Sequence, residues 1–228
     1  MTALEMAGAV PPIPVDLLRA AGVIPVVEIE DDGLAVDLAQ ALEAGGLPIV
    51  EVTFRTESAA NALRLVARGA PGVFLMAGTV TSTRQADIAH DAGAQMLVAP
   101  GLNHAVVEHA MRIGIPMLPG VCTPSEVDAA VSLGLAAVKL FPIEPIGGVG
   151  YLRALAGPYP AMKWAPTGGI TSEALPGYLS IESVLACGGS WVAPRADIAA
   201  GRFEEISARA AAAVEIVRRA RAGKGGAS

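Results

Sequence analysis

Short apolar segments rich in β-branched residues alternate with Ala-rich amphipathic segments along nearly the whole chain of 228 residues. The apolar segments predict strands at residues 23–29, 48–53, 73–77, 95–99, 115–119, 136–141, 162–165 and 183–187. The amphipathic segments predict helices at residues 33–44, 57–69, 83–92, 103–113, 124–133, 148–156, 172–179 and 201–221, with a further short helix at 14–21. Eight strand–helix units in one chain of this length predict an α/β fold, a closed (β/α)8 TIM barrel of parallel strands.

Glycine marks the corners at which the predicted helices give way to strands. It stands shortly before a predicted strand at positions 45–46, 69, 93, 114 and 134. Glycine at a helix end adopts the left-handed conformation that closes the helix. An open doubly wound sheet is the alternative to a barrel, but no Gly-x-Gly-x-x-Gly motif follows the first predicted strand. No segment has the composition of a linker, so we expect one domain over residues 1–228, with residues 1–12 and 222–228 frayed.

The composition excludes several classes of protein. Hydrophobic residues make up 53% of the chain and charged residues 17%, which rules out intrinsic disorder. The net charge is −6 and no basic run occurs outside the last dozen positions, so we expect no binding to nucleic acid or to membranes. The first ten residues lack the basic start of a secretion signal, and the two cysteines, Cys122 and Cys187, lie far apart. We therefore expect a cytoplasmic protein without a disulfide framework.

Lysine is rare in this chain, which has only Lys139, Lys163 and Lys224. Lys139 lies near the carboxyl end of an apolar predicted strand, the end at which barrel enzymes build their active sites. Apolar surroundings disfavour a charged ammonium, and a neutral amine can attack a ketone to form a Schiff base. The alternative is a structural lysine whose ammonium group reaches water or a carboxylate. Lys163 is expected to begin its strand at the opposite end of the barrel, which favours a structural role.

An acidic residue, Glu51, lies among apolar neighbours near the end of the second predicted strand. Burial disfavours a charged carboxylate, and a carboxyl group in such surroundings is suited to proton transfer. Arg55 follows just past the strand, where its guanidinium could bind a substrate carboxylate with two hydrogen bonds. A plain Glu51–Arg55 salt bridge at the end of the strand is the alternative interpretation.

Two glycine pairs follow the last two predicted strands, in the segments APTGGI (165–170) and ACGGSW (186–191). In barrels these two loops often form a phosphate site, because glycine lets backbone N–H groups approach the anion. One pair alone could merely turn the chain, whereas two pairs at matching places in consecutive units favour a binding site.

The remaining polar residues are weaker candidates. His90, His104 and His109 fall in predicted helices, and a spacing of five does not place the last two on one helix face. We therefore expect no metal site and no zinc-dependent chemistry. The acidic residues at positions 28 and 30–32 are expected to form a solvated turn that also caps a helix.

Eight motifs follow one another along the chain: EVTFRT (51–56), AGTV (77–80), APGLN (99–103), PGVCTPSE (119–126), VKLFP (138–142), GGVGYLRALAGP (147–158), PTGGI (166–170) and CGGSW (187–191). In these motifs the sequence resembles the class I aldolases that act on 2-keto-3-deoxy-6-phosphogluconate and 4-hydroxy-2-oxoglutarate. The similarity extends from about residue 14 to residue 215. It implies a (β/α)8 barrel, a homotrimer, and catalysis without a metal or other cofactor. The chain departs from the family pattern in the stretch after LFP and at Gly150, where a lysine is common, so the rim beyond the phosphate is less well defined.

The resemblance implies a carbon–carbon lyase. Lys139 would form the Schiff base with the keto carbon of pyruvate, and Glu51 would move protons as the general acid and base through a bound water. The substrate would be a small keto-acid sugar phosphate, 2-keto-3-deoxy-6-phosphogluconate of the Entner–Doudoroff pathway. Its cleavage would give pyruvate and glyceraldehyde 3-phosphate, and the activity could extend to cleavage of 4-hydroxy-2-oxoglutarate to pyruvate and glyoxylate.

The resemblance also implies two sets of substrate contacts. Those around the pyruvate portion are Arg55, Thr79, Pro100 and Phe141. Those around the aldehyde portion and its phosphate are Thr167, Gly168, Gly169, Gly189 and Ser190.

Two alternatives stay open. The substrate could be the galactonate epimer of the phosphorylated acid, although Arg55, Thr167 and Ser190 favour the gluconate form because galactonate relatives tend to differ at those places. The chain could instead be a phosphate-binding barrel of another kind, either an enzyme or a sugar-phosphate-binding protein. Such a protein would use the glycine loops but would have no need for Lys139 within a strand.

Overall fold

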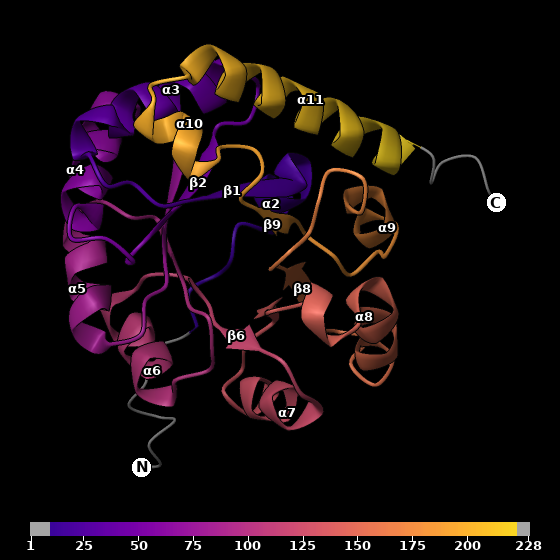
Figure 1. Cartoon of the computed structure of the whole chain (residues 1–228). Coiled ribbons are helices and arrows are strands. Elements are labelled where there is room, and N and C mark those ends of the chain that lie inside the picture. The colour runs from indigo at the N-terminus through magenta and orange to yellow at the C-terminus, as the bar shows by residue number, and fades with distance from the viewer. Residues whose placement is uncertain (1–9, 223–228) are drawn as a thin grey trace.

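Parallel strands alternate with helices throughout the computed structural model, which describes residues 10–222. Figure 1 shows the helices arranged around the strands. The strands are β1 (Val23–Val27), β2 (Ile49–Thr53), β3 (Phe74–Gly78), β4 (Met96–Val98), β5 (Met117–Leu118), β6 (Gly120–Val121), β7 (Ala137–Leu140), β8 (Lys163–Pro166) and β9 (Cys187–Gly189). Of the termini expected to fray, residues 1–9 and 223–228 lie outside the described residues. Residues 10–12 have no regular secondary structure, and residue 222 belongs to the last helix.

The strands form a curled parallel arrangement. Six of them pair in the order β5-β4-β3-β2-β1-β9 and three in the order β6-β7-β8. Only Pro119 separates β5 from β6, and proline has no N–H to donate to a sheet ladder. Two isolated parallel bridges, Trp164 with Val184 and Thr167 with Gly188, connect β8 to the segment around β9. Because the paired strands are parallel, their carboxyl ends lie together on one side of the fold.

The helices are α2 (Val15–Ala21), α3 (Ala35–Ala44), α4 (Ala59–Gly69), α5 (Thr83–Asp91), α6 (His104–Ile113), α7 (Pro124–Ser132), α8 (Gly148–Ala156), α9 (Leu175–Leu179), α10 (Arg195–Ala199) and α11 (Phe203–Ala222), with two 3-10 turns, η1 (Asp32–Leu34) and η2 (Glu144–Ile146). Local capping explains several of their beginnings. The side chains of Ser82 and Asn103 accept backbone N–H groups at the starts of α5 and α6, and Thr123 with Glu126 forms a capping box on α7. Among residues 10–222, no helix is both long and apolar enough to cross a lipid bilayer.

The predicted order of strands and helices is confirmed, with differences at some boundaries. The fifth predicted strand, 115–119, is divided into β5 and β6 because the pairing resumes after Pro119. The last predicted strand, 183–187, begins too early, since β9 pairs Gly188 and Gly189 with β1. Glycine is depleted in strands, but a Cβ at Gly188 would lie 2.5 Å from Thr167 Oγ1, so this site requires glycine. The predicted helix at 172–179 is the shorter α9, and the sequence pattern did not predict α10 or the 3-10 turns.

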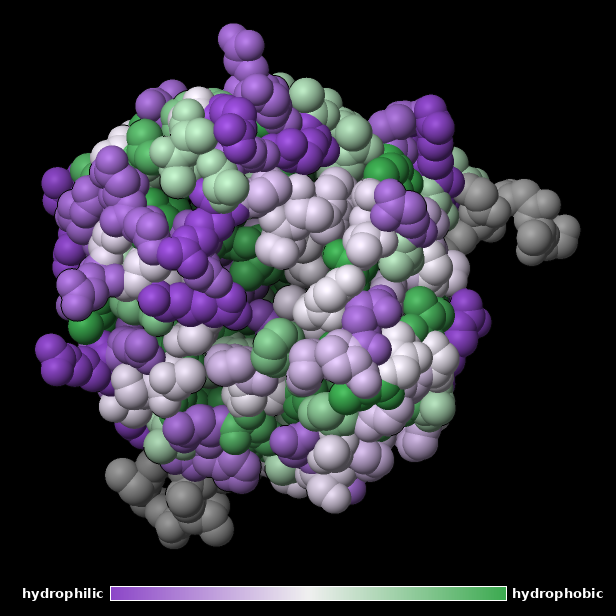
Figure 2. Space-filling view, in the orientation of Figure 1, coloured by the Kyte–Doolittle hydropathy of each residue, from purple (hydrophilic) through white to green (hydrophobic). Residues whose placement is uncertain are grey.

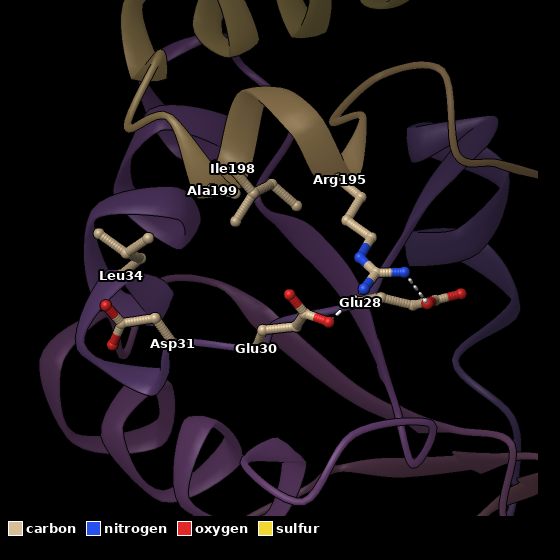
Figure 3. A pocket seen from close by; sticks show the side chains of 7 residues that line it. All are labelled: Glu28, Glu30, Asp31, Leu34, Arg195, Ile198 and Ala199. Atoms are coloured by element: carbon tan, nitrogen blue, oxygen red, sulfur yellow. Dashed lines mark hydrogen bonds and ion pairs between the residues drawn. The ribbon is translucent and has the colours of Figure 1, made fainter.

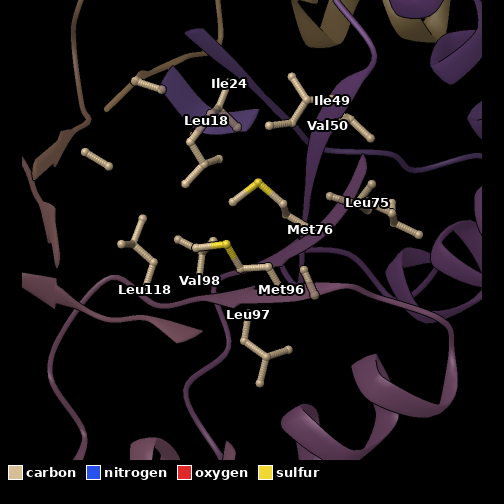
Figure 4. Packing of buried hydrophobic residues seen from close by; sticks show 14 of the residues in the cluster. Leu18, Ile24, Ile49, Val50, Leu75, Met76, Met96, Leu97, Val98 and Leu118 are labelled. Atoms are coloured by element: carbon tan, nitrogen blue, oxygen red, sulfur yellow. The ribbon is translucent and has the colours of Figure 1, made fainter. Parts of the chain in front are cut away.

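Slender apolar side chains fill the core. Figure 4 shows Met76 and Met96 among Leu, Ile and Val side chains, and both methionines are fully buried at paired positions of β3 and β4. All five positions of β2 are buried, as expected for a parallel strand that is covered on both faces. A charged residue within such a strand therefore has to find a partner inside the protein.

Candidate active site

A buried amine and a buried carboxylate meet among the strands. Lys139 is the third residue of β7, Glu51 is the third residue of β2, and Lys139 Nζ lies 3.2 Å from Glu51 Oε1. The two side chains are only 6% and 3% exposed. Removing charged groups from water is so costly that a buried ion pair contributes little net stability. The pair therefore indicates a chemical role for both side chains.

Small residues on the neighbouring strands make room for this pair. Lys139 lies opposite Gly120 of β6 and Ala165 of β8 in the strand register. Gly78, the last residue of β3, borders Glu51 so closely that an added Cβ would lie 2.2 Å from Glu51 Oε1. The AGTV motif contains Gly78, but only the folded structure shows that this glycine borders the carboxylate.

The second lysine of the strands lies elsewhere. Lys163 is the first residue of β8 and pairs with Ala137, two positions before the Lys139–Ala165 pairing. The prediction that Lys163 begins its strand is therefore confirmed. Lys163 therefore lies at the amino end of the strands, whereas Lys139 lies nearer their carboxyl ends.

Three more predicted site residues follow the ends of strands next to the pair. Lys139 Nζ lies 5.5 Å from the ring centroid of Phe141, a distance at which a cation and an aromatic face attract each other. Thr79 directly follows β3 and has a φ of +59°, which is rare and strained for a β-branched residue. The carbonyl of Pro100 packs against Gly120, where a Cβ would lie 2.1 Å from Pro100 O. Strain and close packing of this kind are common where side chains are held for function.

Arg55 lies just beyond β2, and its ion-pair partner differs from the one considered in the sequence. Its Nη1 lies 2.6 Å from Glu28 Oε1, whereas Glu51 is paired with Lys139, so the Glu51–Arg55 salt bridge is wrong. The acidic turn expected after the first strand does follow β1, and within it the Glu28 side chain is 29% exposed, because β1 and β2 are neighbours and bring Glu28 against Arg55. The capping part of that prediction is confirmed: the Asp31 side chain accepts the Gly33 N–H at the start of η1.

The two glycine loops lie side by side. Thr167, which is buried, bridges to Gly188, and this contact joins the loop after β8 to the loop at β9. Gly169 and Ser190, one from each loop, line the same cavity of about 550 Å³. Gly168 and Gly169 have φ angles of +105° and +85°, which favour glycine. Of the five residues expected around the aldehyde and phosphate, Thr167, Gly168 and Gly189 do not line this cavity, although Gly168 and Gly189 directly precede residues that do.

Two charged residues also line this cavity, Glu28 and Arg195. Figure 3 shows a second pocket, which shares Glu28 and Arg195 with this cavity. In it the guanidinium of Arg195 lies between the carboxylates of Glu28 and Glu30, and its ion pair with Glu28 spans 3.9 Å. The sequence gives no signal for Arg195, because its partners lie far away along the chain. Figure 2 shows hydrophilic side chains over much of the surface in this orientation, around apolar residues near its hollowed centre.

No group of three or more His, Cys, Asp or Glu side chains within residues 10–222 is arranged to hold a metal ion. His109 contacts Asp87 instead, with 2.5 Å between Nε2 and Oδ1. Both cysteines carry free thiols. Burial raises the pKa of the Cys187 thiol, which keeps it protonated and unreactive.

Known proteins with this arrangement of parallel strands and helices over most of the chain include aldolases. The chain belongs to the KDPG and KHG aldolase family, whose model matches residues 15–209. A 2-dehydro-3-deoxy-phosphogluconate aldolase of Treponema pallidum is 44% identical over 202 residues, which cover 89% of this chain and 96% of that protein. The KHG/KDPG aldolase of Escherichia coli K12 is 40% identical over 87% of this chain and 93% of its own length.

A solved structure of the family extends the similarity to three dimensions. KDPG aldolase from Legionella pneumophila has a TM-score of 0.85 and 35% identity, over 89% of this chain and 98% of that one. In that structure pyruvate was captured at low pH as a covalent carbinolamine intermediate.

Proposed function

We propose that this chain is a class I aldolase that reversibly cleaves 2-keto-3-deoxy-6-phosphogluconate to pyruvate and glyceraldehyde 3-phosphate. The observation that carries the proposal is the buried Lys139 amine, 3.2 Å from Glu51 and bordered by the residues of the family motifs. Relatives at 44% and 40% identity are named for this activity, and the second name includes the KHG activity as well. Cleavage of 4-hydroxy-2-oxoglutarate to pyruvate and glyoxylate is therefore part of the proposal.

The chemistry follows from the amine and its carboxylate. Lys139 Nζ, after giving up a proton, attacks the keto carbon, and loss of water from the resulting carbinolamine gives a cationic iminium. Glu51, or a water that it holds, takes the proton of the C4 hydroxyl. The electrons of the C3–C4 bond then flow into the iminium to form an enamine, and the aldehyde leaves. The enamine then takes a proton at C3. Hydrolysis of the resulting iminium releases pyruvate and regenerates the amine.

The other predicted residues have roles in substrate binding. Arg55 and Thr79 bind the carboxylate side of the pyruvate portion, and Pro100 and Phe141 pack around the amine. The aldehyde portion and its phosphate bind at the two glycine loops, through Thr167, Gly168, Gly169, Gly189 and Ser190. The cavity of about 550 Å³ beside Gly169 and Ser190 supports this assignment.

We infer a closed eight-stranded barrel for the fold. It follows if β5 and β6 count as one strand interrupted at Pro119, and if the bridges at Val184 and Gly188 complete the contact between β8 and β9. The chain is then a single domain whose active site lies at the carboxyl ends of the strands.

The remaining parts of the proposal rest on the family resemblance. The enzyme works in the cytoplasm as a homotrimer, without a metal or other cofactor, since the covalent imine supplies the electron sink. Sedimentation equilibrium measures the oligomeric state directly, and a monomer at micromolar concentration would contradict the trimer.

Reduction with borohydride in the presence of pyruvate tests the mechanism. The reagent reduces an imine to a stable secondary amine, so we expect a mass increase on the peptide that contains Lys139. An adduct on Lys163, or no adduct at all, would overturn the assignment.

A comparison of substrates tests specificity. The galactonate epimer differs at one hydroxyl, and the 24% identical structure of a KDPGal protein supports only the shared fold. We expect faster cleavage of the gluconate form. Faster cleavage of the galactonate form would reverse the substrate assignment, and a sugar-phosphate-binding protein without lyase activity would release no pyruvate.

A further inference from the structure

We propose that Arg195 is a further substrate-binding residue, which binds the phosphate of the aldehyde portion and so favours phosphorylated over unphosphorylated keto acids. This inference rests on the proposed aldolase function. It concerns a residue that lies outside the motifs of the family resemblance.

The first argument is the position of Arg195. It lines the cavity that also contains Gly169 and Ser190, one residue from each glycine loop. Among the described residues that line this cavity, Arg195 is the only cation. A guanidinium offers five N–H donors in a planar fork, which matches the oxygens of a phosphate.

The second argument is how the side chain is held. Arg195 contacts Glu28 and Glu30, two acidic residues that follow the end of β1. The hydroxyls of Thr56 and Ser58 donate to the carbonyl of Ile29, which ties this acidic segment to the loop after β2. The guanidinium is therefore held between two carboxylates on a segment that is itself anchored (Figure 3).

The third argument is the charge balance. Glu28 lies 2.6 Å from Arg55 but 3.9 Å from Arg195, so its carboxylate is engaged mainly with Arg55. Of the described residues that line the cavity with Gly169 and Ser190, only Glu28 and Arg195 are charged, and their charges balance. The further acids, Glu30 and Asp31, line a second pocket that shares Glu28 and Arg195 with this cavity. Exposed ion pairs contribute little to stability, so the pairs of Arg195 have little value as structural supports.

The geometry of the substrates explains the expected selectivity. The phosphorylated acid carries one anion at C1 and another beyond C6, and the second would reach the cavity wall at Arg195. The second carboxylate of 4-hydroxy-2-oxoglutarate is C5 itself and lies closer to the reacting carbons. Arg195 should therefore matter for the first substrate and not for the second.

Kinetics of Arg195→Ala and Arg195→Lys test the inference. For Arg195→Ala we expect the Michaelis constant (KM) for the phosphorylated substrate to rise about 10-fold or more, as for the loss of a charge-assisted hydrogen bond, with kcat little changed. The Michaelis constant of Arg195→Lys should lie between those of the wild type and Arg195→Ala, because lysine keeps the positive charge but lacks the planar fork of N–H donors. For the unphosphorylated substrate, 4-hydroxy-2-oxoglutarate, the Michaelis constant of Arg195→Ala should stay within about twofold of the wild-type value, because this substrate makes little contact with Arg195.

Arg219→Ala is the matched control, because Arg219 is an exposed arginine that pairs with a carboxylate, Glu215, on α11. It makes the same change in net charge and should leave both KM values unchanged. If KM of Arg195→Ala rises equally for both substrates, or rises for neither, the proposed role of Arg195 in binding the phosphate is overturned.

Binding of inorganic phosphate, measured by calorimetry, separates this inference from the aldolase proposal. We expect wild type and Arg219→Ala to bind phosphate alike, and Arg195→Ala to bind it about 10-fold more weakly. If the wild type shows this pattern yet releases no pyruvate, the inference stands and the aldolase proposal fails. If the enzyme releases pyruvate and Arg195→Ala binds phosphate as the wild type does, the inference fails and the aldolase proposal stands.

Discussion

Two ionic clusters at the carboxyl ends of the strands differ mainly in their exposure to water. Lys139 and Glu51 are almost completely buried, at 6% and 3% exposure of their side chains, and form a single contact of 3.2 Å. The cluster of Arg55, Glu28 and Arg195 is open, with 43%, 29% and 60% of these side chains exposed. The same types of charged group therefore meet in two very different dielectric environments.

This difference separates chemistry from recognition. In the buried pair, low dielectric strengthens the interaction between the charges, and the two groups are close enough for a proton to pass between them. In the open cluster, water and salt screen the charges, so the groups can exchange partners when an anionic substrate arrives. We expect mutations of the first cluster to act on kcat and on folding stability, and mutations of the second to act on KM.

The largest effect should come from Lys139→Met, which removes the amine and keeps much of the side-chain volume. Without an imine there is no electron sink for the C3–C4 bond, so we expect cleavage to fall by at least about 10⁴-fold, more than the loss of general acid–base catalysis alone. Pyruvate release measured through a coupled dehydrogenase assay checks this. Lys163→Met, which changes the lysine at the beginning of β8, is the control and should keep the parent rate. Turnover near the parent level in Lys139→Met would contradict the Schiff-base mechanism.

Glu51→Gln should have the next largest effect, because it preserves the shape of the side chain and removes its ability to take a proton. We expect kcat to fall by about 10²–10⁴-fold, the usual contribution of general acid–base catalysis. The Michaelis constant should change much less. The borohydride adduct at Lys139 should still form, although slowly, and its amount after long incubation distinguishes this variant from Lys139→Met. A full parental kcat would remove Glu51 from proton transfer.

The buried pair also makes a prediction about stability. Lys139→Met leaves the Glu51 carboxylate buried without its partner, which we expect to lower the free energy of unfolding by about 3–5 kcal/mol. The double variant Lys139→Met with Glu51→Gln leaves no buried charge, and it should recover much of that loss. Urea unfolding of the two variants and the parent measures both values. A double variant that is no more stable than Lys139→Met would show that the pairing of charges is not the cause.

Comparison of the two clusters also shows what the sequence could predict. The alternation of apolar and amphipathic segments, with glycine at the corners, predicted the order of strands and helices because these signals are local. Lys139 could be singled out because a lysine within an apolar strand is rare. The positive φ of Gly46, Gly93, Gly114 and Gly134 agrees with the predicted corners.

The partners in the ion pairs could not be predicted, because they depend on which strands become neighbours. Glu51 meets Lys139 from 88 residues away, and Arg55 meets Glu28 from 27 residues away. The nearer candidate, a pair of Glu51 with Arg55, is wrong because Glu51 lies within a strand and Arg55 lies in the loop beyond it. The strand at Gly188 and Gly189 was missed because it also depends on a residue from another strand. Thr167 fills the space that a side chain at position 188 would need, so glycine is required there.

The smallest effect, and the sharpest test of the open cluster, should come from Glu28→Gln. This change removes the charge that holds Arg55 and keeps the shape of the side chain. An exposed ion pair contributes about 0–1 kcal/mol, so we expect KM to rise for both substrates by at most about fivefold, with kcat unchanged. Because salt screens exposed charges, the difference from the parent should shrink as ionic strength rises from about 0.01 M to about 1 M.

Glu215→Gln provides the control for this test, since Glu215 also pairs with two arginines but lies on α11. Arg218 and Arg219 hold the pKa of Glu215 at about 2, so this carboxylate is charged throughout the pH range of the assay. Glu215→Gln therefore removes one negative charge, as Glu28→Gln does. We expect no change in KM at any salt concentration. A rise in KM for Glu28→Gln that persists undiminished at high salt would mean that Glu28 acts through shape or hydrogen bonding and not through its charge on Arg55.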